Sequence, residues 1–264
     1  MSEEVTVKLQ GGIGNNLFQI ASAYSYSLRY NKELVLVNEK FGITHNQLDT
    51  YKSNILQKIN FVSKKEFREF KVYNEPTFNY SAIPKIDGNV YLNGYFQSEK
   101  HFLDYEKEIR ELFFYPDDVI KSVKEKFKDI LELNTCSIHV RRGDYLKLQD
   151  YHPAQSINYY MKAIRQMPED SVFLVFSDDI SWCKSNFPNI PEKFVFIEEN
   201  KDYEDLLLMS FCKNNIIANS SFSWWGAWLN KNEYKKVIAP SKWFGVANNS
   251  NNTVDLYCKD WIVI

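Results

Sequence analysis

The sequence predicts an α/β protein made of two successive parallel-sheet halves, and three observations carry this prediction. From residue 135 onward, short apolar segments alternate with amphipathic helical segments, which is typical of a doubly wound sheet. A strand, a glycine-rich turn and a helix open the chain, as in a βαβ unit. The length of 264 residues suffices for two modest domains. We therefore expect domains at 1–133 and 134–264 that share a rigid cleft.

The first half shows a strand-like segment, a turn and then apolar residues at helical spacing from Leu17 to Leu28. A second buried strand is expected at 33–37, and residues 41–84 lack a clear period, which predicts loops and short helices. The remaining expected elements of this half are a strand at 5–9, a strand at 89–96 and helices at 99–114 and 117–133.

The second half alternates strands and helices regularly. The expected strands lie at 135–140, 171–176, 194–197, 215–218 and 236–239. The expected helices lie at 157–166, 202–212 and 224–229. No glycine- or serine-rich linker separates the halves, so we expect the boundary near residues 131–134.

Charge and hydropathy limit the partners. The formal net charge of −2 gives no general attraction to nucleic acid or to an anionic membrane, so anion binding must come from a local cluster. The chain starts without the basic and apolar regions of a signal peptide, and no apolar run of about 18 residues could span a bilayer. We expect a cytoplasmic protein without stable membrane insertion, at most peripheral to the inner membrane.

The four cysteines are widely separated and lack the spacing of a zinc site, so reduced thiols are expected. The chain also contains no D-x-D sequence, and the adjacent Asp178 and Asp179 supply fewer oxygen ligands than a hard cation requires. We expect neither a metal nor another cofactor.

The segment His139-Val140-Arg141-Arg142-Gly143-Asp144-Tyr145 places two arginines at the exit of a buried strand. A guanidinium binds phosphate or carboxylate bidentately, and ligands of α/β sheets collect beyond the carboxyl ends of the strands. The arginines are therefore candidates for a diphosphate clamp. The alternative is an ordinary surface ion pair between Arg142 and Asp144.

The glycine turn at 11–14 lies between a strand and a helix, where dinucleotide-binding proteins carry G-x-G-x-x-G. Leu17 replaces the third glycine, and Glu39 alone offers an acidic residue near the second strand, which argues against a nicotinamide site. Glycines still let a ligand approach the backbone and the helix amino terminus. Asn15 and Asn16 could bind sugar hydroxyls, or either could simply cap the helix.

Two further segments follow strands in the second half. Asp178 and Asp179 end one strand, and one of them could cap the next helix. Ser220 and Ser221 stand between a strand and a helix, where hydroxyl and backbone N–H groups can bind phosphate. The tryptophans at 224 and 228 share one face of that helix, which favours core packing.

Three motifs together resemble the bacterial α-1,2-fucosyltransferases, and more broadly the enzymes that transfer fucose from GDP-fucose. In chain order they are Gly11-Gly12-Ile13-Gly14-Asn15-Asn16-Leu17-Phe18-Gln19, the segment 139–144, and Ser220-Ser221-Phe222-Ser223-Trp224-Trp225-Gly226-Ala227-Trp228-Leu229. They span nearly the whole chain. The departures are Ile13, where the family usually has Leu, and Asn16, where it usually has Gln.

The resemblance implies a GT-B architecture with two Rossmann-like domains, and GDP-fucose held mainly by the carboxyl-terminal one. It also implies metal-independent transfer of fucose, with inversion, to the 2-hydroxyl of a terminal β-galactoside during synthesis of an O-antigen-like surface glycan. Residues matching donor-binding positions of the family are His139 and Asp205 for guanine, Arg141 for the β-phosphate, Ser220, Ser221 and Phe222 for the nucleotide turn, and Gly14 and Asn15 near the fucose.

Arg141 would be the main catalytic residue, because it can neutralise the charge that develops on the leaving diphosphate. Asp144 is a second catalytic candidate, although it could instead orient Arg142. Asp178 and Asp179 are candidates for contacting the acceptor or acting as base, and the sequence does not choose among the three carboxylates.

Two other classes remain open. A nucleotide-sugar or glycan-binding module could use the same clamp without catalysis. A glycoside hydrolase would need a pair of carboxylates at a fixed separation and would leave no diphosphate for the arginines to bind. The natural acceptor is not evident, and its contacts are expected from residues 41–96.

Overall fold

The computed structural model describes residues 2–37, 48–62, 69–188, 190 and 193–264. The chain divides into two compact units, Met1–Pro116 with Asn251–Cys258, and Asp117–Ser250 with Lys259–Ile264. This division precedes the boundary predicted near residues 131–134. The difference arises because helix α4 (Asp117–Lys126), expected in the first domain, packs on helix α8 (Asp202–Phe211) of the second unit.

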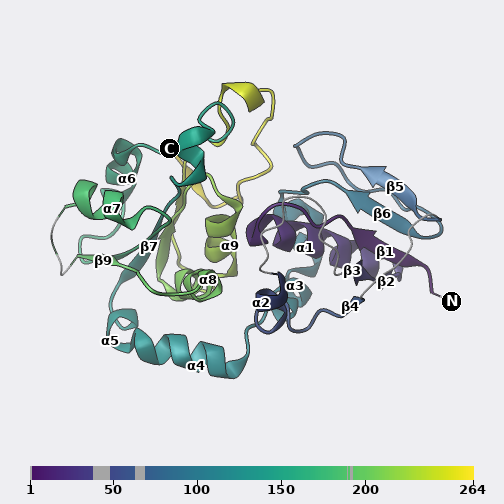
Figure 1. The fold of residues 1–264 in the computed structure, drawn as a ribbon, viewed down its shortest axis with the longest axis horizontal. Helices are drawn as coiled ribbons and strands as arrows, with labels where there is room; N and C mark the ends of the chain where they lie inside the picture. Colours follow the sequence, from purple (N-terminus) through teal and green to yellow (C-terminus); the bar gives the residue numbers. More distant parts are fainter. Residues whose placement is uncertain (1, 38–47, 63–68, 189, 191–192) are drawn as a thin grey trace. The chain divides into compact units, whose positions relative to one another are not determined.

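The first unit contains a four-stranded parallel sheet with the order β2-β1-β6-β5 (Figure 1). The strands are β1 (Glu4–Val7), β2 (Glu33–Leu34), β5 (Lys71–Asn74) and β6 (Val90–Asn93). Helix α1 (Ile13–Tyr30) follows β1 through the glycine turn and buries most of its length. The predicted βαβ start of the chain is confirmed.

The strand predicted at 33–37 divides between two sheets. Its first part, β2, pairs with β1, whereas its second part, β3 (Leu36–Val37), pairs with β4 (Phe61–Val62). Between the two, the Val35 amide still donates to the Val5 carbonyl at 2.9 Å. A continuous apolar run therefore serves two sheets, which a local pattern does not reveal.

The helix predicted at 99–114 is shorter than expected. Two 3₁₀ turns, η1 (Glu99–His101) and η2 (Leu103–Tyr105), precede α3 (Glu106–Leu112). Between the turns, Phe102 leaves the helical region with φ −137° and is fully buried. A short helix α2 (Leu48–Lys52) lies in the segment 41–84, where loops and short helices were expected. Residues 38–47, which include Glu39, and residues 63–68 lie outside the described residues.

The second unit contains a six-stranded parallel sheet with the order β12-β11-β10-β7-β8-β9. Its strands are β7 (Thr135–Val140), β8 (Val172–Ser177), β9 (Phe194–Phe196), β10 (Asn214–Ile216), β11 (Val237–Ala239) and β12 (Ile262–Val263). The strand order reverses between β7 and β10, so the predicted doubly wound sheet is confirmed. The carboxyl ends of these two strands define the topological switch point where such sheets bind ligands.

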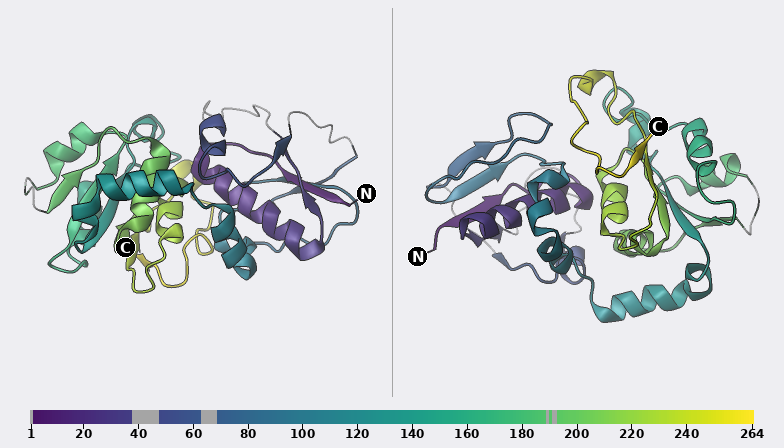
Figure 2. Two further views of the ribbon diagram at one scale, coloured as in Figure 1. Left: turned by 90° about the horizontal axis from the view of Figure 1, so that it is seen from below. Right: turned by 180° about the vertical axis from the view of Figure 1, so that it is seen from behind.

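Helices lie on both faces of this sheet (Figures 1 and 2). They are α4, α5 (Lys128–Leu131), α6 (Ile157–Ile164), α7 (Ile180–Asn186), α8 and α9 (Ser221–Leu229), with 3₁₀ turns η3 (Asp144–Lys147) and η4 (Val246–Asn248). The helix predicted at 117–133 breaks at Phe127, whose φ of −117° interrupts it between α4 and α5. A helix was expected after Asp179 but without bounds for α7, and β12 was not predicted.

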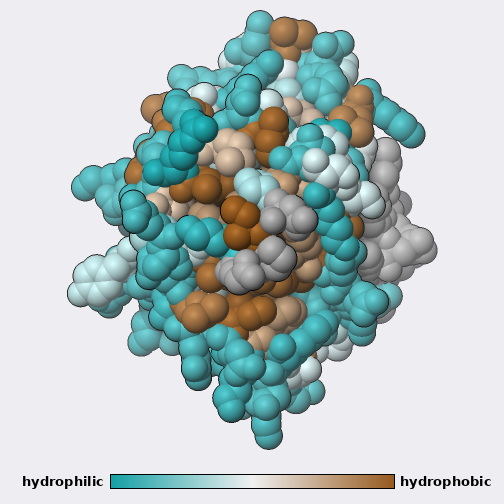
Figure 3. Space-filling model, turned by 90° about the vertical axis from the view of Figure 1, so that its left-hand side faces the viewer, coloured by the Kyte–Doolittle hydropathy of each residue, from teal (hydrophilic) through white to brown (hydrophobic). Residues whose placement is uncertain are grey.

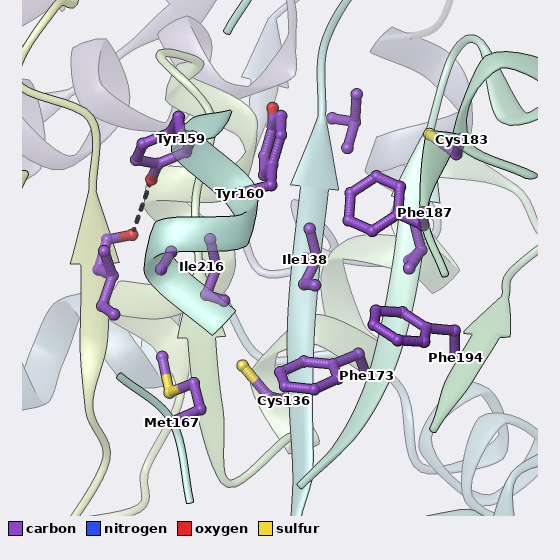
Figure 4. Close-up of a cluster of buried hydrophobic side chains, with 14 residues drawn as sticks. Cys136, Ile138, Tyr159, Tyr160, Met167, Phe173, Cys183, Phe187, Phe194 and Ile216 are labelled. Carbon is purple, nitrogen blue, oxygen red and sulfur yellow. Dashed lines mark hydrogen bonds between the residues drawn. The ribbon is translucent and has the colours of Figure 1, made fainter. Parts of the chain in front are cut away.

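The core of the second unit packs α6 against β10 and α7 against β8 and β9, around the side chains of the central strand β7 (Figure 4). Ile138 of β7 is fully buried, and Phe173 and Phe194 stack with ring centroids 5.2 Å apart. The Tyr159 hydroxyl donates to the Ile217 carbonyl at 2.7 Å and to the Ile238 carbonyl at 3.3 Å. This packing makes the central strands a rigid support for the loops at their carboxyl ends.

Apolar side chains also reach the surface, as the face presented in Figure 3 shows beside α7 and β9. Ile190, for example, is 45% exposed. None of the helices in the described ranges is long and apolar enough to cross a membrane. The thiols of Cys136, Cys183 and Cys212 are buried in the second unit.

Candidate active site

Arg141 leaves the carboxyl end of the central strand β7 and is held by two carboxylates. Its Nη2 lies 2.7 Å from Asp144 Oδ1, and its Nη1 lies 3.0 Å from Asp178 Oδ2. Its Cζ lies 5.5 Å from the centre of the Tyr145 ring. The side chain remains 34% exposed, so the guanidinium is fixed in position while an anion can still reach it.

Asp178 follows β8 and shapes the arginine loop. Its Oδ1 accepts a hydrogen bond from the Arg142 amide at 2.9 Å, while its Oδ2 pairs with Arg141. A Cβ added to Gly143 would lie 2.7 Å from that Oδ2, so the loop needs glycine here. One carboxylate thus fixes both the backbone of the loop and its first guanidinium.

Arg142 points toward α7 rather than joining Arg141. Its Nε donates to Asp179 Oδ2 at 3.1 Å, and its Cζ lies 3.9 Å from the Trp182 ring centre. Asp179 also caps α7 by accepting from the Trp182 amide at 3.2 Å, as one of the two aspartates was expected to do. The interpretation of Asp144 as the partner of Arg142 is wrong, because Asp144 pairs with Arg141.

His139 lies at the end of β7, beside the switch point. Its ring centroid is 5.5 Å from that of Phe222, in the first turn of α9. Burial, with a smaller contribution from Arg141, lowers the pKa of His139 to about 3, so the imidazole is neutral. Its buried Nδ1 has no hydrogen-bond partner among the described residues, which leaves one polar atom of the ring unpaired.

The turn between β10 and α9 completes the switch point. Ser220 is the N-cap of α9, and no side-chain cap bond occupies this helix start within the described chain. The backbone N–H groups of the first turn can therefore bind an anion. The Tyr145 hydroxyl donates to the Asn219 carbonyl at 3.0 Å, which ties the arginine loop to this turn.

Helix α9 is anchored by its tryptophans. Trp224 and Trp225 are fully buried, and Trp228 is nearly so. The rings of Trp224 and Trp228 stack with centroids 6.3 Å apart, which confirms the predicted core packing. These contacts fix the amino terminus of α9 against the sheet.

Asp205 lies in the first turn of α8. Burial is the main reason that its pKa is raised to about 7, with Asp202 and Glu204 adding to the effect. Asn200 Nδ2 donates to its Oδ1 at 3.0 Å, and Lys126 Nζ donates to Asn200 Oδ1 at 2.6 Å. The carboxyl group is thus oriented and changes charge near neutral pH.

The glycine loop of the first unit connects β1 to α1. Gly11 has φ +79°, in the left-handed region that favours glycine. Gly14 is buried in the first turn of α1, and Asn15 Oδ1 accepts from Gln97 Nε2 at 2.7 Å. The helix begins at Ile13 with Gly12 as its N-cap, so neither Asn15 nor Asn16 caps it.

Asn16, the departure from the family pattern, is buried. Its Nδ2 donates to the Gln10 carbonyl and to Gln19 Oε1, both at 3.2 Å. The side chain therefore holds the glycine loop in shape, and this accounts for its position without a substrate contact.

Sequence reasoning missed several residues of these loops. Tyr145 was part of the arginine motif, and its place after Asp144 could have marked it as a support. Gln97 gave no signal, because its partner Asn15 lies 82 positions away in the chain. No group of three or more His, Cys, Asp or Glu residues within the described part of the chain is arranged to hold a metal ion.

Two similar proteins from Escherichia coli cover nearly the whole chain. An O-antigen biosynthesis glycosyltransferase is 31% identical over 94% of this chain and 97% of its own length. An alpha-1,2-colitosyltransferase is 32% identical over 98% of both chains. A human galactoside alpha-(1,2)-fucosyltransferase is 29% identical over 35% of this chain.

Solved structures share the fold at low sequence identity. The fucosyltransferase NodZ from Bradyrhizobium superposes with a TM-score of 0.55 at 14% identity, covering 86% of this chain and 92% of that chain. POFUT1 in complex with GDP-fucose gives 0.52 at 12% identity, covering 88% and 93%. The predicted GT-B type of α/β fold is thereby confirmed.

The model of one protein family, described as "Glycosyl transferase family 11", matches residues 2–264. The match includes the arginine loop, the β10–α9 turn and the glycine loop. It agrees with the family suggested by the three motifs. The chain belongs to glycosyltransferase family 11.

Proposed function

We propose that the protein transfers L-fucose from GDP-fucose to the 2-hydroxyl of a terminal β-galactoside, with inversion at the anomeric carbon, during synthesis of a surface glycan. The observation that carries this proposal is the Arg141 guanidinium, held by two carboxylates at the switch point of the second unit. Support also comes from relatives named for O-antigen synthesis and for α-1,2 transfer.

The donor-binding residues divide by chemistry. The Arg141 cation and the N–H groups at the start of α9, beside Ser220, Ser221 and Phe222, suit a diphosphate. Neutral His139 and the oriented Asp205 carboxyl suit the donors and acceptors on the edge of a guanine base. Membership of the family and structural similarity to a protein solved with GDP-fucose support this assignment.

In the transfer step, the bond between the fucose anomeric carbon and the β-phosphate oxygen breaks, and its electron pair stays on the diphosphate. The acceptor hydroxyl oxygen forms the new bond to that carbon and loses its proton. Arg141 stabilises the negative charge as it develops on the leaving oxygen, as preorganised donors do in other transfer reactions. Asp144 and Asp178 keep the guanidinium aimed while the site is empty.

The proton of the acceptor hydroxyl needs a route to solvent or to a base. Asp178 and Asp179 each accept hydrogen bonds that shape a loop or a helix start, which makes them poor candidates for a base. Asp144 is 53% exposed and pairs with Arg141, so it is the better candidate of the three. An oxocarbenium-like centre also accepts a hydroxyl with little assistance.

We further propose that the reaction needs no divalent metal, because Arg141 and the start of α9 can together offset the diphosphate charge. The experiment is incubation of the purified protein with GDP-fucose and a panel of β-galactosides, with and without EDTA. We expect a fucosylated disaccharide with an α-1,2 linkage in both conditions. No transfer to any acceptor contradicts the function, and loss of transfer with EDTA contradicts the metal-free part.

A second donor is worth testing, because one similar protein is a colitosyltransferase. Colitose is L-fucose without its 3-hydroxyl, so the same site could accept either sugar. Parallel assays with GDP-fucose and GDP-colitose rank the two by kcat/KM. GDP release that requires an acceptor separates either enzyme from a module that only binds the nucleotide sugar.

A further inference from the structure

The carboxyl-terminal edge of the first unit's sheet carries a network of side-chain amides that joins two loops. Gln19 Oε1 accepts a hydrogen bond from the backbone N–H of Gln10 at 3.1 Å, and Gln19 Nε2 donates to the backbone carbonyl of Gly94 at 3.2 Å. The glycine loop after β1 is thereby tied to the turn after β6. Neighbouring parallel strands bring these loops together, and ligands of such sheets collect at this edge.

The turn after β6 has an unusual backbone that is held from outside. Phe96 has φ +53° although it is not glycine, and it is fully buried. Such a conformation is unfavourable for a residue with a side chain and persists only where surrounding contacts determine it. Here Glu75, which follows β5, accepts the amides of Tyr95 at 2.7 Å and Phe96 at 2.9 Å through its two oxygens.

Gly94 leaves room for that carboxylate. A Cβ at Gly94 would lie 2.4 Å from the Cβ of Glu75, so a larger residue would displace the Glu75 side chain. The Glu75 carboxylate and the close approach at Gly94 therefore fix this turn, and Gln97 directly follows it. Because Glu75 holds this strained turn in one conformation, it also fixes the direction in which Gln97 leaves the turn.

Gln97 in turn orients Asn15. Its Nε2 donates to Asn15 Oδ1 at 2.7 Å, which settles the direction of the Asn15 amide. The other end of that amide, Nδ2, lies over Gly11, where an added Cβ would be only 2.3 Å away. Asn15 and Gln97 are both partly exposed, so this pair lies at the surface beside the glycine loop.

We propose that Gln97 is a positioning residue for sugar transfer, which holds Asn15 so that its Nδ2 donates a hydrogen bond to an oxygen of the sugar substrate, with Glu75 fixing the turn that carries Gln97. The inference rests on the proposed function and extends it to the first unit. A neutral N–H donor suits a hydroxyl or ring oxygen, which carries no charge.

Two substitutions test the direction of the amide without removing its hydrogen bond. Asn15→Asp keeps an oxygen to accept from Gln97 but replaces the outward donor by an oxygen. Gln97→Glu supplies an oxygen that accepts from Asn15 Nδ2, so the amide turns and directs its own oxygen outward. Both variants should keep the melting temperature of the wild type, and both should lose about tenfold in kcat/KM for the transfer.

The matched control is Gln57→Glu. Gln57 is exposed, belongs to the same unit and also donates its Nε2 to a carbonyl, that of Phe114, at 2.9 Å. The substitution Gln57→Glu introduces the same charge as Gln97→Glu and should leave kcat/KM unchanged. GDP affinity, measured by calorimetry, should be equal in all four proteins, because the nucleotide-binding residues lie in the second unit.

The outcomes separate the inference from the function. Wild-type rates in Asn15→Asp and Gln97→Glu overturn the positioning role, and so does a loss of rate that follows a fall in melting temperature. Absence of transfer by the wild-type protein would overturn the proposed function instead.

Discussion

The loops after β7 and β1 occupy equivalent places in their sheets but differ in chemistry. Each follows the strand at which the strand order reverses, and each leads toward a helix or 3₁₀ turn. The loop after β7 carries two guanidinium groups neutralised by aspartates. The loop after β1 carries side-chain amides that hydrogen bond one another.

The difference teaches how one architecture can address two kinds of ligand. Carboxylates that pair with a guanidinium hold it in one position, in which it can bind an anion. Side-chain amides set the direction of single hydrogen bonds without adding a net charge, which suits neutral hydroxyl groups. We therefore expect substitutions in the loop after β7 to affect the chemistry of the donor, and those in the loop after β1 to affect the position of the sugar.

The largest effect should come from Arg141→Ala. Removing the cation leaves the charge on the departing diphosphate without its main partner, so kcat should fall by about 100- to 1,000-fold. Circular dichroism and melting temperature should change little, since the side chain is partly exposed. Arg29→Ala, which removes an arginine–aspartate pair of the first unit, should retain the wild-type rate. A near-normal rate for Arg141→Ala would remove this residue from the mechanism.

Next in size, Gly143→Ala should disturb the arginine loop itself. The new Cβ would meet Asp178 Oδ2 at 2.7 Å and force apart the contact that aims Arg141. We expect a rate loss of about tenfold or more, through misplacement of the guanidinium. Steady-state kinetics with GDP-fucose measure it.

Gly12→Ala is the control in the other loop, since no described heavy atom lies within 4 Å of its added Cβ. It should leave the rate nearly unchanged, while stability should fall slightly because alanine is a poorer N-cap residue than glycine. Equal losses in Gly12→Ala and Gly143→Ala would show that both loops respond to any added bulk, and the comparison between them would fail.

The sequence predicted those parts of the fold that depend on local patterns. Strand β7 matches its predicted bounds because Cys136, Ile138 and Val140 stand at every second position, which is the pattern of a strand. Strand β5 was missed because it is mostly exposed at the sheet edge, and the bounds of α7 were not predicted because its seven residues are too few to show a period. The break between β2 and β3 depends on partners far along the chain.

The candidate site divides in the same way. His139, Arg141 and Asp144 lie close together in the sequence, so their motif could be recognised. The partners of Arg142 could not be assigned, because Asp179 and Trp182 come from another strand and helix. Gln97 and Glu75 act through contacts across the sheet edge, and neither belongs to a local pattern.

A smaller and pH-dependent effect is expected for GDP binding. If guanine N–H groups donate to Asp205, only the ionised carboxylate binds well. With a pKa of about 7 in the free protein, the apparent affinity should fall about tenfold from pH 8 to pH 6. His139, with a pKa of about 3, does not titrate in this range. Calorimetric titrations with GDP at several pH values measure the slope.

Asp205→Asn is the control for this titration, because it should remove that part of the slope that Asp205 causes. The same substitution should change stability with a definite sign. Burial raises the folded pKa above the unfolded value, so the folded state is favoured at low pH, and this advantage is lost as the pH rises through about 7. Asp205→Asn should therefore be more stable than the wild type at pH 8. Equal stability there would contradict the burial of this charge.

The smallest effect on rate should come from Arg142→Lys. This residue is the neighbour of Arg141, whose replacement by alanine should have the largest effect. The lysine keeps the charge but loses the planar contact with Trp182 and the Nε bond to Asp179, so the free energy of unfolding should fall by about 1–2 kcal/mol. Urea denaturation measures this loss, while kcat should fall less than tenfold. Because Arg141→Ala should show the reverse pattern, the two variants separate chemistry from support within two adjacent residues. If Arg142→Lys instead lost rate without losing stability, both arginines would act on the diphosphate.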